Sequence, residues 1–278
     1  MITRLYKVFN IIFSFFDQLK FFIYEKIKLK IARYKFLKEK KGNEANTIDI
    51  ILPTYNRSKM LMERSIPSVL NQSHKKFRLL IIGDCCTDDT EEVVKSFNDK
   101  RIIFFNLSKR EKRYPPSPEN HWFAGPVTAI NEALKFVESD WIARIDDDDT
   151  WTPDHLEELL SFALKKKSEF VSSSYTIIQD NKEIVKNFQN ETPPIGGVQT
   201  WLYRSYLKFF KSNINCWRKS WNKVNDLDLQ NRFYIAGVII NYLNLSTCII
   251  KPRPGEKEIG IKAYKSKPND YLKKYEFK

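Results

Sequence analysis

Near the start of the chain, apolar residues recur at three- and four-residue spacing, which is typical of one face of a helix. The face consists of Leu5, Phe9, Ile12, Phe16, Leu19, Ile23 and Ile27. Further phenylalanines widen it, namely Phe13, Phe15 and Phe22. The spacing predicts one amphipathic helix, and the polar, glycine-containing stretch 40–46 predicts a linker after it.

From residue 48 onward, short apolar runs alternate with helical patterns. Strands are predicted at Ile48–Leu52, Phe77–Ile82, Ile102–Phe105 and Trp141–Ile145. Helices are predicted at Lys59–Gln72 (interrupted near Pro67), Thr90–Phe97, Val127–Val137 and Asp154–Lys166. Strands that alternate with helices in this way indicate βαβ units. We therefore expect an α/β fold with a mostly parallel central sheet flanked by helices.

The pattern changes after residue 168. A hairpin is predicted across Asp180-Asn181, from Phe170–Ile178 to Glu183–Phe188, and is followed by a loop at Glu191–Gly197. The region 200–235 is rich in Trp, Tyr and Arg, and a last strand is predicted at 245–251. This break predicts one domain with two halves, 47–150 and 151–255, and a basic tail at 256–278.

Composition narrows the classes of protein that fit. The 278 residues are 42% hydrophobic and 29% charged, which is a globular composition and excludes a disordered or collagen-like chain. The four cysteines contain no C-x-x-C pair, which argues against a zinc knuckle or a disulfide scaffold and favours a reducing cytosol.

The positive charge is concentrated in the N-terminal arm. Residues 1–46 hold eleven Lys and Arg against four Asp and Glu, a net +7 of the total +13. A uniformly basic chain would favour nucleic acid, whereas a basic arm indicates a local partner, so no nucleic acid is expected. The longest uncharged run, Val8–Phe16, is nine residues, and a membrane-spanning helix needs about 20. We expect residues 1–37 to lie on an anionic membrane surface; a helix packed on the domain or in a dimer is the alternative.

Polar clusters directly follow the first, second and fourth predicted strands. They are Pro53-Thr54-Tyr55-Asn56-Arg57, Gly83-Asp84-Cys85-Cys86-Thr87-Asp88-Asp89-Thr90, and Asp146-Asp147-Asp148-Asp149. Ligands of open α/β sheets bind beyond the carboxyl ends of the strands, so these clusters should meet at one edge.

Consecutive aspartates repel one another unless a cation is present, and carboxylate oxygens suit Mg²⁺ or Mn²⁺ together with substrate phosphates. A solvated acidic turn before the next helix is the alternative, but the shared edge favours a metal–diphosphate site. Asp84 lies close enough to its strand to accept a hydrogen bond from a nucleotide base, whereas Asp88 and Asp89 fit a helix N-terminus. Tyr55 is placed either to stack on a base or to fill the turn.

The order of these clusters, with Gly125-Pro126-Val127-Thr128-Ala129-Ile130-Asn131 between the second and third, resembles the family 2 inverting glycosyltransferases of GT-A fold over about residues 47–250. The resemblance implies that residues 47–150 bind a nucleotide sugar and residues 151–255 an acceptor. Tyr55 and Asp84 would hold uracil or a related base, and Pro53, Asn56 and Arg57 would line that site. Asp146 and Asp147 would hold the donor, and Asp148 with Asp146 would bind Mn²⁺ or Mg²⁺.

The family also has a carboxylate base in an E-D-x-D-L-x-x-R segment. The nearest match is Asn225-Asp226-Leu227-Asp228-Leu229-Gln230-Asn231-Arg232, which places Asp226 at the base position. An ordinary aspartate is ionised at neutral pH and can accept a proton; the alternative is that Asp226 only caps a helix.

The chain departs from the family pattern at several positions. Ile130 precedes Asn131 where the family often has Arg, so Arg144, Arg204 or Arg113 must supply that contact. Asn225 replaces a Glu, and Cys85 and Cys86 stand where Gly and Ser are commoner. The Q-x-x-R-W motif of the processive members is missing, which favours transfer of one sugar per encounter.

Other candidate groups have two interpretations. Trp201, Tyr203, Trp217 and Trp221 could be core residues or a sugar-stacking platform, Arg204 could bind an acceptor phosphate, and His155 is expected to be structural. The resulting hypothesis is a metal-dependent enzyme that is cytoplasmic and peripheral on the inner face of the cell membrane. It would transfer one sugar, from a UDP-sugar by preference, to a saccharide or lipid-linked acceptor of a cell-surface glycan. An inactive nucleotide-sugar-binding module, a nucleotidyltransferase and a nucleic-acid-binding protein are the alternatives.

Overall fold

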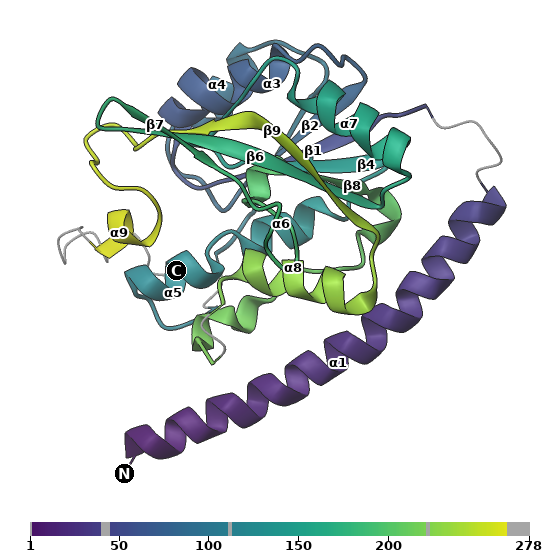
Figure 1. Ribbon diagram of the computed structural model, residues 1–278. Helices are drawn as coiled ribbons and strands as arrows, with labels where there is room; N and C mark the ends of the chain where they lie inside the picture. The colour runs from purple at the N-terminus through teal and green to yellow at the C-terminus, as the bar shows by residue number, and fades with distance from the viewer. Residues whose placement is uncertain (1, 40–44, 111–112, 221–222, 266–278) are drawn as a thin grey trace.

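The computed structural model describes residues 2–39, 45–110, 113–220 and 223–265. Residues 40–44 of the expected linker, residues 266–278 of the expected tail, and Trp221 lie outside these ranges. The first element is one long helix, α1 (Ile2–Glu39), which lies along one side of a domain built on a central sheet (Figure 1). The predicted N-terminal helical arm is therefore confirmed.

In the described residues the sheet has nine strands, in the order β3-β2-β1-β4-β8-β6-β9-β5, with β7 paired to β6. The first half supplies β1 (Ile48–Thr54), β2 (Phe77–Gly83), β3 (Ile102–Asn106) and β4 (Trp141–Arg144), which pair in parallel. The second half supplies β5 (Thr150–Trp151), β6 (Phe170–Gln179), β7 (Lys182–Lys186), β8 (Trp201–Arg204) and β9 (Ile240–Ile250). Among these, β6 and β9 are parallel, whereas β8 runs antiparallel to both β4 and β6.

Helices cover both faces of the sheet (Figure 1). One face carries α2 (Ser58–Met60), the π-turn η1 (Leu61–Ser65), α3 (Ile66–Leu70), α4 (Thr90–Ser96) and α7 (His155–Lys166). The other face carries α6 (Val127–Ala133) and α8 (Asn225–Ala236). The remaining described elements are α5 (Pro118–Ala124), α9 (Gly260–Lys265) and the 3₁₀ turns η2 (Val198–Thr200), η3 (Ser205–Leu207) and η4 (Ile214–Arg218). The α/β prediction is confirmed.

Alternation along β1 divides the core into two layers. Ile50 and Leu52 pack in the layer under α3, α4 and α7, while Ile51 packs in the layer under α6 and α8. All seven residues of β1 are buried, as expected for a strand that is covered on both faces. The burial explains why Ile50, Ile51 and Leu52 are consecutive apolar residues, and the buried Asp49 beside them is paired with Arg78 Nε at 2.7 Å.

The structure corrects several boundaries. The predicted interruption of the helix at 59–72 near Pro67 is confirmed as the π-turn η1 (Leu61–Ser65), which ends two residues before this proline. The hairpin is confirmed, with Asp180 and Asn181 both at positive φ. The last strand begins earlier than expected, at Ile240, and β8 was not predicted. Part of the expected tail forms α9, which packs near Trp122.

The apolar face of α1 points away from the domain. Its seven stripe residues are 41–62% exposed: Leu5, Phe9, Ile12, Phe16, Leu19, Ile23 and Ile27. The buried residues of this helix are mainly polar, namely Asn10, Ser14 and Glu25, joined by Leu29. No helix in the described part of the chain combines the length and hydropathy that crossing a bilayer requires.

Candidate active site

A cavity of about 310 Å³ lies at the carboxyl ends of β1, β2 and β4. It is lined by every residue that the sequence suggested for donor, metal or base: Pro53, Tyr55, Asn56, Arg57, Asp84, Asp146, Asp147, Asp148 and Asp226. The strand ends meet there because β1 pairs in parallel with both β2 and β4. The expected convergence of the three polar clusters on one sheet edge is therefore observed.

The loops after β1 and β2 are tied together by side-chain hydrogen bonds. Asn56, at φ 50°, accepts a hydrogen bond from the backbone N–H of Thr87 at 2.8 Å. At the end of β2, a Cβ on Gly83 would lie 2.5 Å from the amide oxygen of Asn106. That oxygen accepts from the backbone N–H of Cys86 at 2.8 Å, so a side chain at position 83 would displace it. The side of the cavity formed by the loops after β1 and β2 is thus fixed by local polar contacts.

Asp84 is held between two arginines. It is 4% exposed, and its carboxylate accepts from Arg110 Nε at 3.0 Å and from Arg113 Nη2 at 2.7 Å. The Arg110 guanidinium also stacks on the ring of Tyr55, 3.7 Å from its centroid. Both predicted base-binding residues, Tyr55 and Asp84, are therefore joined through an arginine that sequence reasoning did not identify.

The aspartate run is held by groups from two other segments. Asp147 accepts from Arg57 Nη1 at 2.6 Å and from Thr54 Oγ1 at 2.9 Å, both after or at the end of β1. Asp148 accepts from Arg253 Nε at 2.6 Å. Arg253, which follows β9, was also missed in the sequence because it belongs to no recognised motif.

Burial and mutual repulsion perturb this cluster. Burial raises the pKa of Asp146 to about 7, against the opposing charge of Arg144. The carboxylates of Asp226 and Asp148 add to the rise in this pKa. Burial and the neighbouring aspartates also raise the pKa of Asp149 well above its usual value. Burial acts on Asp148 as well, but the arginines beside it outweigh burial and lower its pKa.

The donor set fits a hard divalent cation, because a cation would offset both the burial and the neighbouring carboxylates that raise the pKa of Asp146. In the ranges that the structure describes, no three His, Cys, Asp or Glu side chains form a group able to hold a metal by themselves. Mg²⁺ and related ions are usually held by one or two carboxylates together with substrate phosphates. Asp146 and Asp148 match that mode of binding, in which the substrate completes the site.

Asp226 lies in the first turn of α8 and lines the cavity. Its Oδ1 atom is buried and, among the described residues, accepts no hydrogen bond. The nearest cation is Arg144 Nη1 at 3.6 Å. Burial raises the pKa of Asp226, and Arg144 opposes that rise. A carboxylate oxygen without a donor, beside one guanidinium, is arranged as a proton acceptor.

His121 and Trp122 of α5 also line the cavity, and no motif in the sequence had selected either of them. The His121 Nδ1 atom lies 3.1 Å from the Tyr114 hydroxyl, which orients the ring. A Cβ on Gly125 would lie 2.7 Å from the His121 carbonyl oxygen, so glycine allows this turn to approach the site closely.

Other candidates lie outside the cavity. Trp201 and Tyr203 are 0% and 3% exposed and belong to the core, and Trp217 packs partly buried against a small cluster beside α5. The Arg204 guanidinium lies 3.8 Å from the centroid of the Trp141 ring and does not line the cavity; its binding of an acceptor phosphate stays a prediction. His155 is buried, stacks on Trp151 and contacts Thr247 Oγ1 at 2.8 Å, as a structural residue would.

Residues 49–225 match the sequence family described as "Glycosyl transferase family 2". Over 142 residues the chain is 29% identical to the "Putative teichuronic acid biosynthesis glycosyltransferase TuaG" of Bacillus subtilis, covering 50% of this chain and 51% of that protein. Over 139 residues it is 32% identical to the "UDP-Glc:alpha-D-GlcNAc-diphosphoundecaprenol beta-1,3-glucosyltransferase WfgD" of Escherichia coli, covering 50% of this chain and 49% of that protein. The chain therefore spans about half the length of the curated relatives it matches.

Solved structures agree on the fold. S. aureus TarS 1–349 in complex with UDP-GlcNAc superposes with a TM-score of 0.59 and 18% identity, covering 80% of this chain and 61% of that chain. The mannosyltransferase PcManGT from Pyrobaculum calidifontis, in complex with GDP-Man and Mn²⁺, gives a TM-score of 0.51 and 14% identity, covering 88% of this chain and 67% of that chain. The expected GT-A fold is confirmed by this likeness.

Proposed function

This chain belongs to glycosyl transferase family 2 and is a glycosyltransferase, and from that premise we propose that it moves one sugar from a UDP-sugar to an acceptor hydroxyl with inversion at the anomeric carbon. In this proposal residues 47–150 bind the donor and residues 151–255 bind the acceptor. The observation that carries the proposal is that Asp226 and the aspartates 146–148 line one cavity. A base and a diphosphate site in the same cavity are what a single displacement requires.

The chemistry assigns one task to each side of the cavity. Asp226 takes the proton from the acceptor hydroxyl, whose oxygen forms the new bond to the anomeric carbon. The bond from that carbon to the diphosphate oxygen breaks on the opposite face, and the electron pair leaves with the nucleoside diphosphate. Arg57, beside Asp147, is placed to face the phosphates of the donor.

Asp146 and Asp148 would hold Mg²⁺ or Mn²⁺ in this proposal. The cation supplies charge neutralisation for the departing diphosphate. Arg253 and Arg57 partner Asp148 in the protein alone, and they keep this carboxylate ionised for a metal. The structure of PcManGT is a complex with both GDP-Man and Mn²⁺, which supports metal dependence.

A uridine donor is supported by the relatives and by the site. The TarS complex contains UDP-GlcNAc, and the name of WfgD specifies UDP-Glc. Tyr55 offers an aromatic face for a base, and Asp84 offers carboxylate oxygens for its N–H. Pro53 and Asn56 line the same end of the cavity.

We further propose that α1 binds an anionic membrane surface at the inner face of the cell membrane. The support is the exposed apolar stripe of α1 together with exposed lysines on the same helix: Lys20, Lys26, Lys28, Lys30, Lys35 and Lys38. An amphipathic helix of this kind buries its apolar face in the interface and places its cations among anionic headgroups. A lipid-linked glycan acceptor would then be available beside the enzyme, as the diphosphoundecaprenol in the name of WfgD suggests.

The donor site is tested by calorimetry on the full chain with UDP, GDP and CMP, each with and without Mn²⁺. We expect metal-dependent UDP binding that is lost in Asp148→Ala and retained in Asp89→Asn, an exposed aspartate at the start of α4. A preference for GDP would reassign the donor while keeping the mechanism. Absence of nucleotide binding by the folded chain would refute the proposed function.

A further inference from the structure

The side of α1 that packs on the domain is polar, the reverse of an ordinary surface helix. Asn10, Ser14 and Glu25 are 6%, 7% and 1% exposed. Buried polar groups are costly unless they have partners, so this face must be matched by polar groups of the domain. Those partners show what the helix holds.

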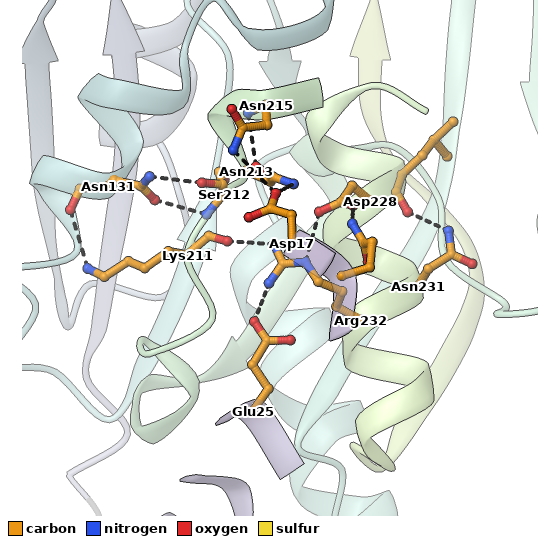
Figure 2. A network of polar contacts seen from close by, with 12 residues as sticks. Asp17, Glu25, Asn131, Lys211, Ser212, Asn213, Asn215, Asp228, Asn231 and Arg232 are labelled. Carbon is orange, nitrogen blue, oxygen red and sulfur yellow. Dashed lines mark hydrogen bonds and ion pairs between the residues drawn. The ribbon is translucent and has the colours of Figure 1, made fainter. Parts of the chain in front are cut away.

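The partners lie on the segment that carries the proposed base. Asp17 Oδ2 accepts from the side-chain amides of Asn213 at 3.0 Å and Asn215 at 3.3 Å. Gln18 Nε2 donates to Asp228 Oδ1 at 2.5 Å. Figure 2 shows Asp17 of α1 beside Asn213 and Asn215 at the start of η4, with Asp228 of α8 close by.

Arg232 of α8 is the centre of this network. Its side chain is 3% exposed and pairs with Glu25 of α1, whose side chain is 2% exposed. It also donates to Asp228 Oδ2 at 2.8 Å and to the Lys211 carbonyl oxygen at 2.5 Å. The ring of Phe21, again from α1, lies 4.3 Å from the guanidinium carbon. Arg232 is the last residue of the motif segment 225–232, so α1 completes the surroundings of a motif residue.

The same segment is anchored from the donor side. Asn131 of α6 donates to the Ser212 carbonyl oxygen at 2.9 Å and accepts from the Ser212 backbone N–H at 2.9 Å (Figure 2). The helix α6 also contributes Ala129 to the wall of the cavity. Residues 211–220 and 223–232 are therefore held between α6 on one side and α1 on the other, and Asp226 belongs to the second of these segments.

We propose that α1 positions the base: Asp17, Gln18 and Glu25 are positioning residues that fix the segments 211–220 and 223–232 so that Asp226 faces the donor. The inference rests on the proposed role of Asp226. This proposal makes α1 a part of the active site. One face of the helix carries the apolar stripe, and the other contacts the residues that position Asp226. The helix is then more than a membrane anchor, because without it Arg232 loses Glu25 and Asp228 loses Gln18 as a partner.

The test uses the full chain with paired variants of the two faces of α1. The inner-face variants are Asp17→Ala/Gln18→Ala and Glu25→Ala; Glu25→Gln keeps an oxygen that accepts from Arg232 and should restore activity. The matched outer-face variant is Phe16→Ser/Ile23→Ser. The probe is release of UDP from UDP-glucose with water as the acceptor, together with UDP affinity and hydrogen exchange of the α8 amides.

We expect both inner-face variants to lower kcat at least about tenfold, or 1.4 kcal/mol, with the KM for UDP-glucose and UDP affinity unchanged. Exchange of the α8 amides should accelerate in these variants only. The inference would be overturned if Asp17→Ala/Gln18→Ala kept the wild-type kcat and the wild-type exchange of the α8 amides. Should Glu25→Ala fail to fold, this double variant alone provides the test. A wild-type chain that binds no nucleotide would refute the proposed function instead, and α8 exchange would still test whether α1 orders this segment.

Discussion

Arg144 Nη1 lies 3.6 Å from Asp226 Oδ1, and the three guanidinium nitrogens of Arg144 are buried without a hydrogen-bond acceptor among the described residues. The arginine is 1% exposed and enters from the end of β4, directly before the aspartate run. It is the cation that opposes the burial-driven rise in the pKa of Asp226. The pairing connects β4 with α8, the helix that carries the proposed catalytic base.

Replacing Arg144 with Met should raise the pKa of Asp226 and so lower kcat, by up to about tenfold for each unit of rise once the pH lies below that pKa. Mn²⁺-dependent UDP binding should weaken over the same pH range, because Arg144 also opposes the burial-driven rise in the pKa of Asp146. Arg144→Lys keeps the charge and should lie between wild type and Met. Steady-state UDP release with calorimetry of UDP binding makes the measurement; equal kcat in all three proteins would exclude the role.

Asp226→Asn should reduce kcat by about 10² to 10⁴, the usual contribution of a general base. The substitution preserves shape, so Mn²⁺-dependent UDP binding should remain. Asp89→Asn is the matched control for a neutral amide at another helix start. If Asp226→Asn transferred sugar at the wild-type rate, the base would have to be sought elsewhere, with His121 the next candidate on the wall of the cavity.

Tyr55→Ala should weaken UDP binding by about tenfold, since stacking of a base on an aromatic ring contributes about 1–3 kcal/mol. The loss would include the stacking of Arg110 on the same ring, which supports Asp84. Tyr55→Phe retains the ring and should bind UDP nearly as wild type does. Calorimetric titration compares the three proteins. Equal affinities for UDP would mean that the uracil ring does not stack on Tyr55.

The outward face of α1 gives a prediction for membranes. Phe16 and Ile23 are 62% and 52% exposed, and burial of each contributes about 1.5–3 kcal/mol. Phe16→Ser/Ile23→Ser should therefore reduce binding to vesicles of phosphatidylserine and phosphatidylcholine by about 10² or more. Binding of the wild type should also weaken as salt rises. Sedimentation with vesicles, and without them to detect self-association, separates a lipid surface from a second copy of the chain.

The pH dependence of stability should contain a signature of His155. Burial lowers its pKa from 6.5 to about 3, so the folded chain holds a neutral ring while the unfolded chain takes up a proton below pH 6.5. The contribution of His155 to the free energy of unfolding is fully present above pH 6.5 and is lost as the pH falls toward 3. Between pH 7 and pH 5 the loss is about 2 kcal/mol. Denaturant unfolding at both pH values should show a smaller loss in His155→Gln.

The sequence was sufficient to predict those features that depend on local pattern. Parallel strands bring their carboxyl ends to one edge, so the three polar clusters could be assigned to one site without knowing any distance. Arg110 and Arg253 could not be found this way, because each reaches the site from a loop whose path depends on tertiary packing. The four-residue strand β8 carries too little alternation to predict a strand, and its place between β4 and β6 is set by non-local pairing.

For the N-terminal helix, the sequence predicted the apolar stripe but not the side that packs on the domain. A signal was present: Asn10, Asp17 and Glu25 recur at seven- and eight-residue spacing, which places them along one line of a helix. Polar residues in such a line, opposite an apolar stripe, would have favoured a helix docked through its polar side.

The position of β8 also determines the order in which the protein can fold. This strand pairs with both β4 and β6, yet it is synthesised long after β4. Until residues 201–204 leave the ribosome, β4 presents an unpaired edge to other chains. Residues 47–150 are therefore not expected to fold as a separate unit, whatever they bind. A fragment ending at residue 150 would expose the edge of β4, which would be prone to aggregation.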